Sequence, residues 1–330
     1  MNRPPSILFI TATRIGDAVL STGLLSYLIE RHPGARLTIA AGPIAAPLFE
    51  AVPGLDRLLV LRKRRWSLHW PALYARTMRC RWDIVVDLRG SAIAWMLRAG
   101  ERRVMAKGDA REHRVRQLAR LFDLDTPPGP TVWTAPRHER AAAELLPPGA
   151  PVLAIGPAAN WRGKQWRGER FAALALRLTA GDGVFPGARI AVLAGAHEYV
   201  QAAPLLAAIP AEHAIDLVGR TELLTAAALL RRCAMFIGND TGLMHIAAAA
   251  GTPTLGLFGP SPAEQYAPWG TCTDIVRTSV PREAMFGPGF DPLTTGTLMD
   301  SLSVEAVATA AAHLWQRSWK DQAGWARAGE

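Results

Sequence analysis

The chain has 330 residues, 49% of them hydrophobic and 20% charged, so it is long enough for two domains and too apolar for a disordered protein. Its three cysteines, Cys80, Cys233 and Cys272, are too few and too scattered for a disulfide framework or a cysteine-rich zinc site, which favours a reducing, cytoplasmic location. Residues 1–150 hold 23 Lys and Arg against 13 Asp and Glu, a balance of +10, whereas residues 151–330 hold 14 against 15, a balance of −1.

The first half alternates apolar runs with a helical pattern. The segment Asp17–Glu30 carries leucines on one side and predicts a helix, and the runs that predict strands are Ile7–Thr11, Leu37–Ala41, Leu58–Leu61 and Ile84–Leu88. The first run is interrupted too early by Arg14 and Asp17 for a signal peptide, and no window reaches the roughly 18 apolar residues of a spanning helix. We therefore expect a soluble or peripheral protein.

The second half repeats the alternation. Apolar faces at helical spacing occur in 171–178 and 223–230, and strands are expected at Val152–Ile155, Arg189–Leu193, Ala214–Leu217, Met235–Ile237 and Thr254–Phe258. Strands that alternate with helices predict parallel sheets joined by crossover helices. The proline-rich run 147–151 indicates a linker, which gives domains at 1–150 and 151–330 with a ligand site in the cleft between them. The last helix, about 304–320, is expected to pack back on the first domain.

Several familiar motifs are absent. No G-x-G-x-x-G follows the first strand, which argues against a dinucleotide oxidoreductase. Gly163-Lys164 lacks the following Ser or Thr of a P-loop, and neither His-Glu pair is followed by the second His of a zinc protease. Asp123-Leu124-Asp125 matches the D-x-D of metal-dependent sugar transferases, but its position after an apolar helical run favours a helix end. We expect no metal site and no cofactor.

The first motif that carries chemistry is Thr13-Arg14-Ile15-Gly16-Asp17, between a strand and a helix. The structural alternative for Asp17 is an N-cap, which is the ordinary use of aspartate at a helix start. The functional alternative is a carboxylate that the helix dipole keeps ionised and that accepts a proton from a hydroxyl nucleophile.

Two further motifs follow strands of the second half. In the loop from Gly156 to Trp166, Asn160 stands among small residues and Lys164 supplies a charge suited to phosphate, or is simply a solvated lysine. In 238–245, the amides of Thr241 and Gly242 start a helix and predict an anion site. Asp240 is then an N-cap or a ligand of sugar hydroxyls, and His245 is a site residue or a buried core histidine.

The fourth motif, 256–262, is another strand end whose loop contains Gly259, Pro260 and Ser261; it frames a base or a phosphate, or is only a turn. In the basic half, Arg62, Lys63, Arg64 and Arg65 precede Trp66, Trp70, Leu73, Tyr74 and Met78, which have roughly helical spacing. This stripe either faces the core of the domain or forms a surface that docks on anionic lipid.

The four motifs, in this order, resemble glycosyltransferase family 9, the bacterial lipopolysaccharide heptosyltransferases. The resemblance runs from about Ile7 to Trp269 and again over 299–303, and its most specific parts are 14–17 and 239–245. It implies a GT-B fold, in which two Rossmann-like, doubly wound parallel-sheet domains face a central cleft. The N-terminal domain would bind the acidic acceptor and the C-terminal domain the nucleotide sugar, usually ADP-heptose.

The resemblance also implies roles for single residues. Asp17 matches the general base, and Lys164 matches the lysine that meets the donor diphosphate. It also places Asp240, Thr241, Gly242 and His245 in the donor site. From their loops we add Asn160, Gly259 and Pro260 as expected donor-binding residues, and the positive balance of the first half gives the expected acceptor-binding residues Arg14, Arg62, Lys63, Arg64 and Arg65. Arg167 departs from the family, which usually has proline there, and Arg162 has no assigned role.

The sequence therefore predicts an inverting, metal-independent glycosyltransferase that acts on a lipopolysaccharide core precursor. It is expected to be a monomer in the cytoplasm, in peripheral contact with the anionic inner membrane, and to bind no nucleic acid. Two alternatives stay open: a nucleotide-sugar epimerase of the same fold, and a nucleic-acid-binding protein suggested by the basic run.

Overall fold

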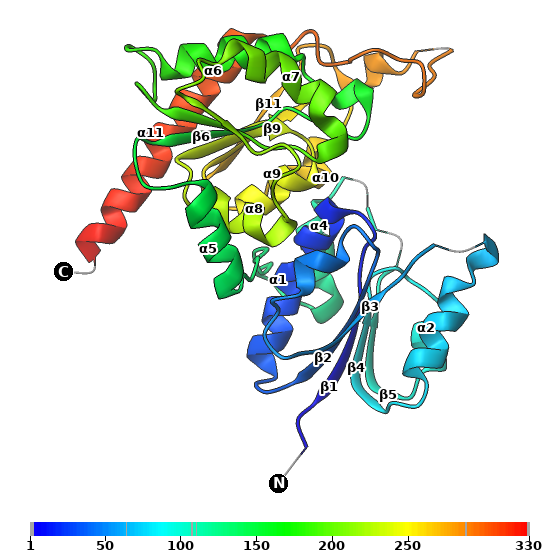
Figure 1. Cartoon of the computed structure of the whole chain (residues 1–330). Coiled ribbons are helices and arrows are strands. Elements are labelled where there is room, and N and C mark those ends of the chain that lie inside the picture. Colours follow the sequence, from blue (N-terminus) through cyan, green and yellow to red (C-terminus); the bar gives the residue numbers. More distant parts are fainter. Residues whose placement is uncertain (1–2, 64, 107, 110, 288, 329–330) are drawn as a thin grey trace. The chain divides into compact units, whose positions relative to one another are not determined.

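The computed structural model describes residues 3–63, 65–106, 108–109, 111–287 and 289–328, and of residues 319–328 it describes the backbone alone. The chain folds into two compact units, Met1–Pro136 and Arg137–Glu330 (Figure 1). The first unit holds 21 Lys and Arg against 11 Asp and Glu, so the whole positive excess belongs to it. No helix among the described residues combines the length and the apolarity needed to cross a bilayer.

The first unit is built on a five-stranded parallel sheet with the order β3-β2-β1-β4-β5. The strands are β1 (Ser6–Ile10), β2 (Arg36–Ala41), β3 (Leu55–Val60), β4 (Trp82–Asp87) and β5 (Ala99–Val104). The helices are α1 (Ile15–Arg31), α2 (His69–Thr77), α3 (Ile93–Met96) and α4 (Arg114–Ala119). Because the chain leaves β1 toward β2 and later returns to β4 on its other side, the sheet is doubly wound.

Helices cover both faces of this sheet (Figure 1). On one face Leu8 and Ile10 of β1 pack with Leu73 of α2 and Ile93 of α3 in a buried cluster. The other face is covered by α1, which buries a continuous set of apolar residues that includes Val19, Leu24, Leu25 and Leu28. The central strand is buried on both sides, as expected for a parallel sheet between two helical layers.

The second unit contains a six-stranded parallel sheet with the order β11-β10-β9-β6-β7-β8. Its strands are β6 (Val152–Gly156), β7 (Arg189–Val192), β8 (Ala214–Asp216), β9 (Met235–Asn239), β10 (Thr254–Phe258) and β11 (Thr273–Arg277). Its helices are α5 (Pro136–Leu145), α6 (Gly168–Thr179), α7 (Tyr199–Ala208), α8 (Leu223–Leu230), α9 (Gly242–Ala249), α10 (Ala263–Tyr266) and α11 (Val304–Ala328). Numbered within the unit, the strand order is 3-2-1-4-5-6, which is the Rossmann order.

The core of the second unit lies between its sheet and the helices α6, α7 and α11, which Figure 1 shows on one side of the strands. Phe171 and Leu174 of α6, Leu205 of α7 and Leu314 of α11 belong to one buried cluster with the sheet residues. Helix α11 packs against α6 and β11, so the described part of the last helix is attached to the second unit.

The sequence prediction of two α/β domains with doubly wound parallel sheets is confirmed. Nine of the eleven strands coincide with the predicted ones to within a few residues. The strands β5 and β11, which both lie at sheet edges, were not predicted from the sequence. The compact units divide at Pro136/Arg137, and α5 therefore belongs to the second unit, whereas the sequence suggested a boundary in the proline-rich run 147–151.

Candidate active site

The expected donor residues of the second unit gather at the carboxyl ends of three neighbouring strands. In the order β10-β9-β6, the loop after β6 carries Lys164, the turn after β9 carries Asp240, and the loop after β10 carries Gly259 and Pro260. The chain continues from β6 to one side and returns at β9 on the other, so the β6 and β9 loops flank the topological switch point. This is the position where open α/β sheets bind ligands.

An ion pair joins the first two loops. The Nζ atom of Lys164 lies 2.6 Å from Oδ2 of Asp240, whose side chain is 8% exposed, and the lysine side chain is 26% exposed. The Nε2 atom of His245 lies 4.0 Å from the other carboxylate oxygen of Asp240 and is buried. Lys164, Asp240 and His245 therefore form one polar cluster at the ends of β6 and β9. Of the three side chains, that of Lys164 is the most exposed to solvent.

The start of helix α9 stands beside this cluster. Its N-cap is Thr241, whose side chain makes no capping hydrogen bond, and Gly242 is the first helical residue. The N-cap alternative for Asp240 is therefore wrong, because Asp240 precedes the cap. Amides at an uncapped helix start attract anions through their unpaired N–H groups and the helix dipole.

Asn239, which the sequence analysis did not select, holds the Lys164 loop at both ends. Its fully buried side chain donates from Nδ2 to the carbonyl of Pro157 at 2.7 Å, and its Oδ1 accepts from the amide of Trp166 at 3.2 Å. The opposed Gly156 and Gly238 let the two strands end close together, since a Cβ on Gly238 would lie 2.8 Å from the carbonyl of Gly156. The available sequence signal was that Asn239 opens the most specific motif, 239–245, directly after a predicted strand.

We predict that Asn239→Asp lowers stability and weakens nucleoside diphosphate binding together. The substitution replaces the NH₂ group that donates to the carbonyl of Pro157 with a carboxylate oxygen, which cannot donate. The carbonyl is then buried without a partner, which lowers the free energy of unfolding by about 1–3 kcal/mol. Thermal melting and calorimetric titration with ADP measure the two effects. The control is Thr252→Val, which removes a buried hydrogen bond to Leu230 away from these loops. Equal ADP affinity in both variants at matched stability would show that Asn239 does not position the loop.

The β10 loop adds a hydroxyl without a protein partner. Ser261 is 4% exposed, and within the described chain its Oγ atom has no hydrogen-bond partner. The preceding carbonyl, that of Pro260, accepts from Nε of Arg282 at 2.9 Å. Gly259 is required by close packing, because a Cβ there would lie 2.5 Å from the sulfur of Met299. This loop therefore presents a hydrogen-bonding group from a third strand end.

The remaining residues of the Lys164 loop divide into surface and structural ones. Asn160 and Arg162 are exposed. Arg167 is the N-cap residue of α6 and makes a two-pronged ion pair with Asp300, with both N–O distances at 2.6 Å. The hydrogen bonds from Arg167, followed by its charge, lower the pKa of the Asp300 carboxyl. The arginine that departs from the family pattern thus ties α6 to the segment before α11.

In the first unit, Asp17 lies in the first turn of α1 directly after β1. The N-cap of this helix is Arg14, an exposed residue, so the N-cap alternative for Asp17 is wrong. Asp17 is half-buried and stands where the helix dipole favours a negative charge. The loop passes close to Gly42, at which a Cβ would lie 2.6 Å from Cα of Thr13.

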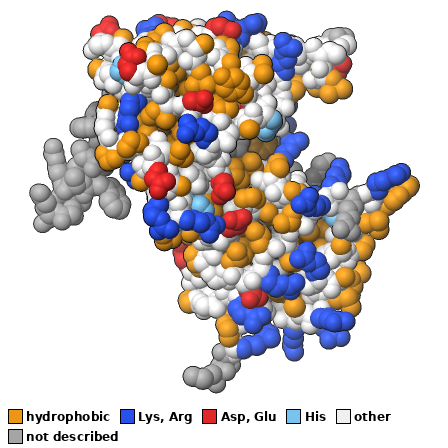
Figure 2. Space-filling model, in the orientation of Figure 1, with side chains coloured by type: hydrophobic (Ala, Val, Ile, Leu, Met, Phe, Trp, Pro, Cys, Tyr) orange, Lys and Arg blue, Asp and Glu red, His pale blue; other side chains and the backbone are white. Residues whose placement is uncertain are grey.

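The basic residues of the first unit follow strand ends at the same edge of its sheet. Arg62, Lys63 and Arg65 are exposed after β3, and Arg64 lies outside the described residues. Figure 2 shows many basic side chains and few acidic ones on the face of this unit that it draws.

Arg89 was not predicted as a site residue. It follows β4, which pairs with the central strand β1. Its guanidinium lies 5.7 Å from the ring centre of Trp70. Burial, then the charges of Arg89 and Lys63, lower the pKa of His69, so these three residues share one neighbourhood. The Nδ1 atom of His69 is enclosed and has no hydrogen-bond partner in the described part of the chain. The rule that located the other loops, polar residues after a predicted strand, would have found Arg89 after Ile84–Leu88.

The apolar stripe Trp66, Trp70, Leu73, Tyr74 and Met78 contains both core residues and exposed residues. Leu73 is buried, and Trp70 and Tyr74 pack against the core of the first unit, as the structural alternative predicts. Trp66 is 87% exposed, and Met78 is also exposed. Two more exposed apolar residues, Trp95 and Met96, lie on α3, which contacts α2.

The D-x-D sequence lies at a helix end. Asp123 terminates a short 3-10 helix, Arg120–Phe122, in the left-handed backbone conformation, and its carboxylate lies 3.5 Å from Nη1 of Arg103. Among the residues that the structure describes, no group of three or more His, Cys, Asp or Glu side chains is arranged to hold a metal ion.

Two doubly wound parallel sheets, each with polar loops at the carboxyl ends of its central strands, define a two-domain α/β protein with Rossmann-like units. The solved structures similar to this chain are of the GT-B type. They include a family 9 glycosyl transferase from Veillonella parvula, with a TM-score of 0.77, 20% identity and coverage of 95% of this chain and 97% of the other. They also include the ADP-heptose lipopolysaccharide heptosyltransferase II of Escherichia coli, with a TM-score of 0.75, 19% identity and coverage of 95% and 99%.

The sequence comparisons identify the family. The family model of glycosyltransferase family 9 (heptosyltransferase) matches residues 92–287, which is more than half of the chain. The chain is also 23% identical over 303 residues to lipooligosaccharide heptosyltransferase 2 of Haemophilus influenzae, an alignment that covers 80% of this chain and 85% of the relative. The chain belongs to glycosyltransferase family 9, and the resemblance inferred from the four motifs is confirmed.

Proposed function

We propose that this protein transfers a heptose from ADP-heptose to a hydroxyl of an acidic lipopolysaccharide core acceptor, with inversion at the anomeric carbon and without a metal ion. The observation that carries the proposal is the Lys164–Asp240 pair at the switch point of the second sheet, beside the uncapped start of α9. Relatives named heptosyltransferases support the choice of sugar and acceptor.

The donor diphosphate binds at the carboxyl ends of β6, β9 and β10. Lys164 and the amides that begin α9 supply the positive potential that a diphosphate requires. Asp240 would repel phosphate oxygens, so it binds hydroxyls of the sugar or ribose and keeps Lys164 oriented. The unpartnered hydroxyl of Ser261 donates a further hydrogen bond from the adjacent loop.

The reaction is a single displacement. The acceptor oxygen forms a bond to the anomeric carbon while the bond from that carbon to the diphosphate oxygen breaks. Asp17 takes the proton of the acceptor hydroxyl as general base. The leaving nucleoside diphosphate gains negative charge, which Lys164 and the start of α9 stabilise. No covalent enzyme intermediate forms, so the configuration at the anomeric carbon inverts.

The first unit supplies the acceptor site. Arg14 adjoins Asp17 in the chain, and Arg62, Lys63, Arg64 and Arg65 follow a strand whose carboxyl end lies at the same sheet edge. To these we add Arg89 and His69, since Arg89 stacks on Trp70 beside an imidazole with an unused ring nitrogen. Phosphates or carboxylates of the core sugars are the anions that such a group recognises.

A transfer assay with ADP-heptose, UDP-sugars and GDP-sugars tests the proposal. We expect product from ADP-heptose only in the presence of a lipopolysaccharide core acceptor, an inverted anomeric configuration by NMR, and full activity in EDTA. Loss of activity in EDTA that Mg²⁺ or Mn²⁺ restores would contradict metal independence and return attention to Asp123 and Asp125. Donor turnover without acceptor would favour the epimerase alternative, and preference for another nucleotide would overturn the donor.

We further propose that the enzyme is a monomer that acts in the cytoplasm, at the cytoplasmic face of the inner membrane. Exposed Trp66 next to Arg65, with Trp95 and Met96 on neighbouring α3, combines apolar and basic groups on one unit. Aromatic side chains partition into bilayer interfaces, and each nearby cation contributes about 1 kcal/mol to the free energy of binding to anionic lipid.

We therefore expect the double substitution Arg65→Glu and Trp66→Ser to weaken sedimentation with anionic liposomes by tenfold or more at low salt, since charge reversal and loss of an inserted ring act together. The acceptor KM should rise and the donor KM should stay constant. The control Val200→Ser removes a side chain that is 83% exposed on the second unit and should change neither. If liposome binding changes neither with the double substitution nor with the salt concentration, this surface is not the membrane contact.

A further inference from the structure

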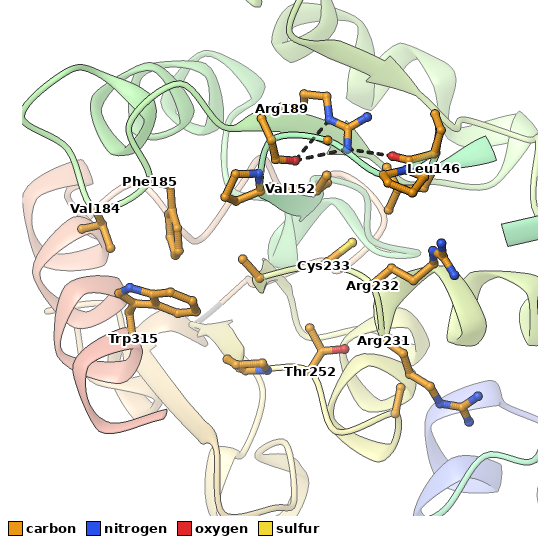
Figure 3. Close-up of a pocket in the computed structure, with 18 of the residues that line it drawn as sticks. Leu146, Val152, Val184, Phe185, Arg189, Arg231, Arg232, Cys233, Thr252 and Trp315 are labelled. Carbon is orange, nitrogen blue, oxygen red and sulfur yellow. Dashed lines mark hydrogen bonds between the residues drawn. The ribbon is translucent and has the colours of Figure 1, made fainter. Parts of the chain in front are cut away.

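A cavity of about 640 Å³ lies in the second unit at the amino ends of its strands (Figure 3). Val152 at the start of β6, Arg189 at the start of β7 and Pro253 before β10 line its floor. The segment 147–151 and Trp315 of α11 form its sides. The Lys164–Asp240 cluster lies at the carboxyl ends of the strands of the same sheet, so this cavity is at the opposite edge of the sheet from the proposed donor site.

One end of the cavity is aromatic. The rings of Phe185 and Trp315 pack edge to face with centroids 4.9 Å apart, and Val184 adjoins them. Figure 3 shows this group at one end of the cavity and Arg231 and Arg232 at the other. Phe185 is buried in the core, whereas Trp315 is half-buried, so Trp315 offers the apolar ring surface on which a flat ligand ring can pack.

The polar wall of the cavity is positively charged. Arg189, Arg231 and Arg232 line it, and its lining includes no carboxylate. Arg231 forms an ion pair with Glu139, with 2.9 Å between Nη1 and Oε1. Arg189 donates hydrogen bonds from Nε and Nη2 to the carbonyls of Pro147 and Ala150. Arg232 is exposed and has no ion pair within the described residues. Burial raises the pKa of Cys233 to about 12, so this lining thiol stays neutral and provides no counter-charge.

We propose that this cavity binds a small organic anion with a flat apolar ring. The ring packs on Trp315, which Phe185 supports from the core, and the anionic group meets Arg232 and the side of Arg189 that faces away from Pro147 and Ala150. Its volume is in the range of about 300–1,000 Å³ typical of small-molecule sites. The charge and the aromatic surface lie on different parts of the wall, which matches a ligand with one charged and one apolar end. The proposal does not depend on the transferase function.

Calorimetric titration of the whole chain with phenyl phosphate tests this site, with inorganic phosphate and AMP as parallel probes. We expect phenyl phosphate to bind more tightly than inorganic phosphate, because only the former fills the aromatic end. Arg232→Ala should raise its Kd about tenfold, the effect of one charge-assisted hydrogen bond, and Trp315→Leu should raise it while leaving inorganic phosphate unchanged. Arg140→Ala, which removes an exposed arginine outside the cavity, is the matched control.

The double variant Lys164→Ala and Asp240→Asn separates this site from the donor site, because it removes the donor-site cation without leaving the buried carboxylate unpaired. Retained binding of phenyl phosphate in this double variant, together with a rise in Kd of about tenfold in Arg232→Ala, would support the proposal. Loss of binding in the double variant, or an equal change in Arg232→Ala and Arg140→Ala, would overturn it. Equal affinity for inorganic phosphate and phenyl phosphate would exclude the aromatic end from the site. AMP binding in the double variant would identify a nucleotide as the ligand source, and phenyl phosphate binding without AMP binding would identify another aryl anion.

Discussion

Asp17→Asn should lower kcat by about 10²–10⁴, the usual contribution of a general base, while ADP affinity and the melting temperature change little. Asparagine has nearly the shape of aspartate but cannot take the proton of the acceptor hydroxyl. Because Asp17 stands in the first turn of α1 and is not its N-cap, the stability that it gives through the helix dipole is about 0.3–1 kcal/mol. Measured kcat and thermal melting therefore separate the catalytic role from the structural one.

The matched control is Glu169→Gln, which neutralises an exposed carboxylate in the first turn of α6. It removes the same type of dipole interaction outside the proposed site and should leave kcat unchanged. If Asp17→Asn retained the wild-type kcat, or if both substitutions lowered it equally, Asp17 would not be the base. Its carboxylate would then have a structural role.

Lys164→Ala should raise the Kd for ADP and lower kcat by about 10²–10³, the cost of losing one preorganised group that stabilises developing charge. It should also destabilise the second unit, because the carboxylate of Asp240 is only 8% exposed and loses its partner. Leaving a buried polar group unsatisfied costs about 1–3 kcal/mol. The fall in activity is therefore mixed with a fall in stability, and a second variant is needed.

The double variant Lys164→Ala and Asp240→Asn provides it. Neutralising Asp240 removes the buried unpaired charge, so stability should recover toward that of the wild type. Activity and ADP affinity should stay low, because the cation is still missing. Recovery of activity along with stability would mean that the pair is a structural ion pair, and the donor diphosphate would then bind elsewhere. Calorimetry with ADP and denaturant unfolding, carried out on the wild type, Lys164→Ala, Asp240→Asn and the double variant, give the complete cycle.

The elements that are buried on both faces, and the loops that follow them, can be predicted from local patterns in the chain. Central strands such as β6 and β10 are continuous apolar runs, and their burial leaves a pattern that is local in the chain. Because parallel strands end at one edge of a sheet, the positions of Asp17, Lys164 and Asp240 after such runs were also predictable. The edge strands β5 and β11 were missed, since β5 contains Glu101, Arg102 and Arg103 and is only half-buried, so it has no apolar run.

Which of these groups are in contact depends on the order of the strands in the folded sheet. Lys164 and Asp240 are 76 residues apart in the chain, and their contact depends on β6 and β9 being neighbours in the sheet. The same pairing lets Asn239 hold both ends of the Lys164 loop, and the path of the chain before α11 brings Asp300 to Arg167. Hydrogen bonds and ion pairs act over about 3–4 Å, and strand order sets such distances in a way that no local sequence pattern records.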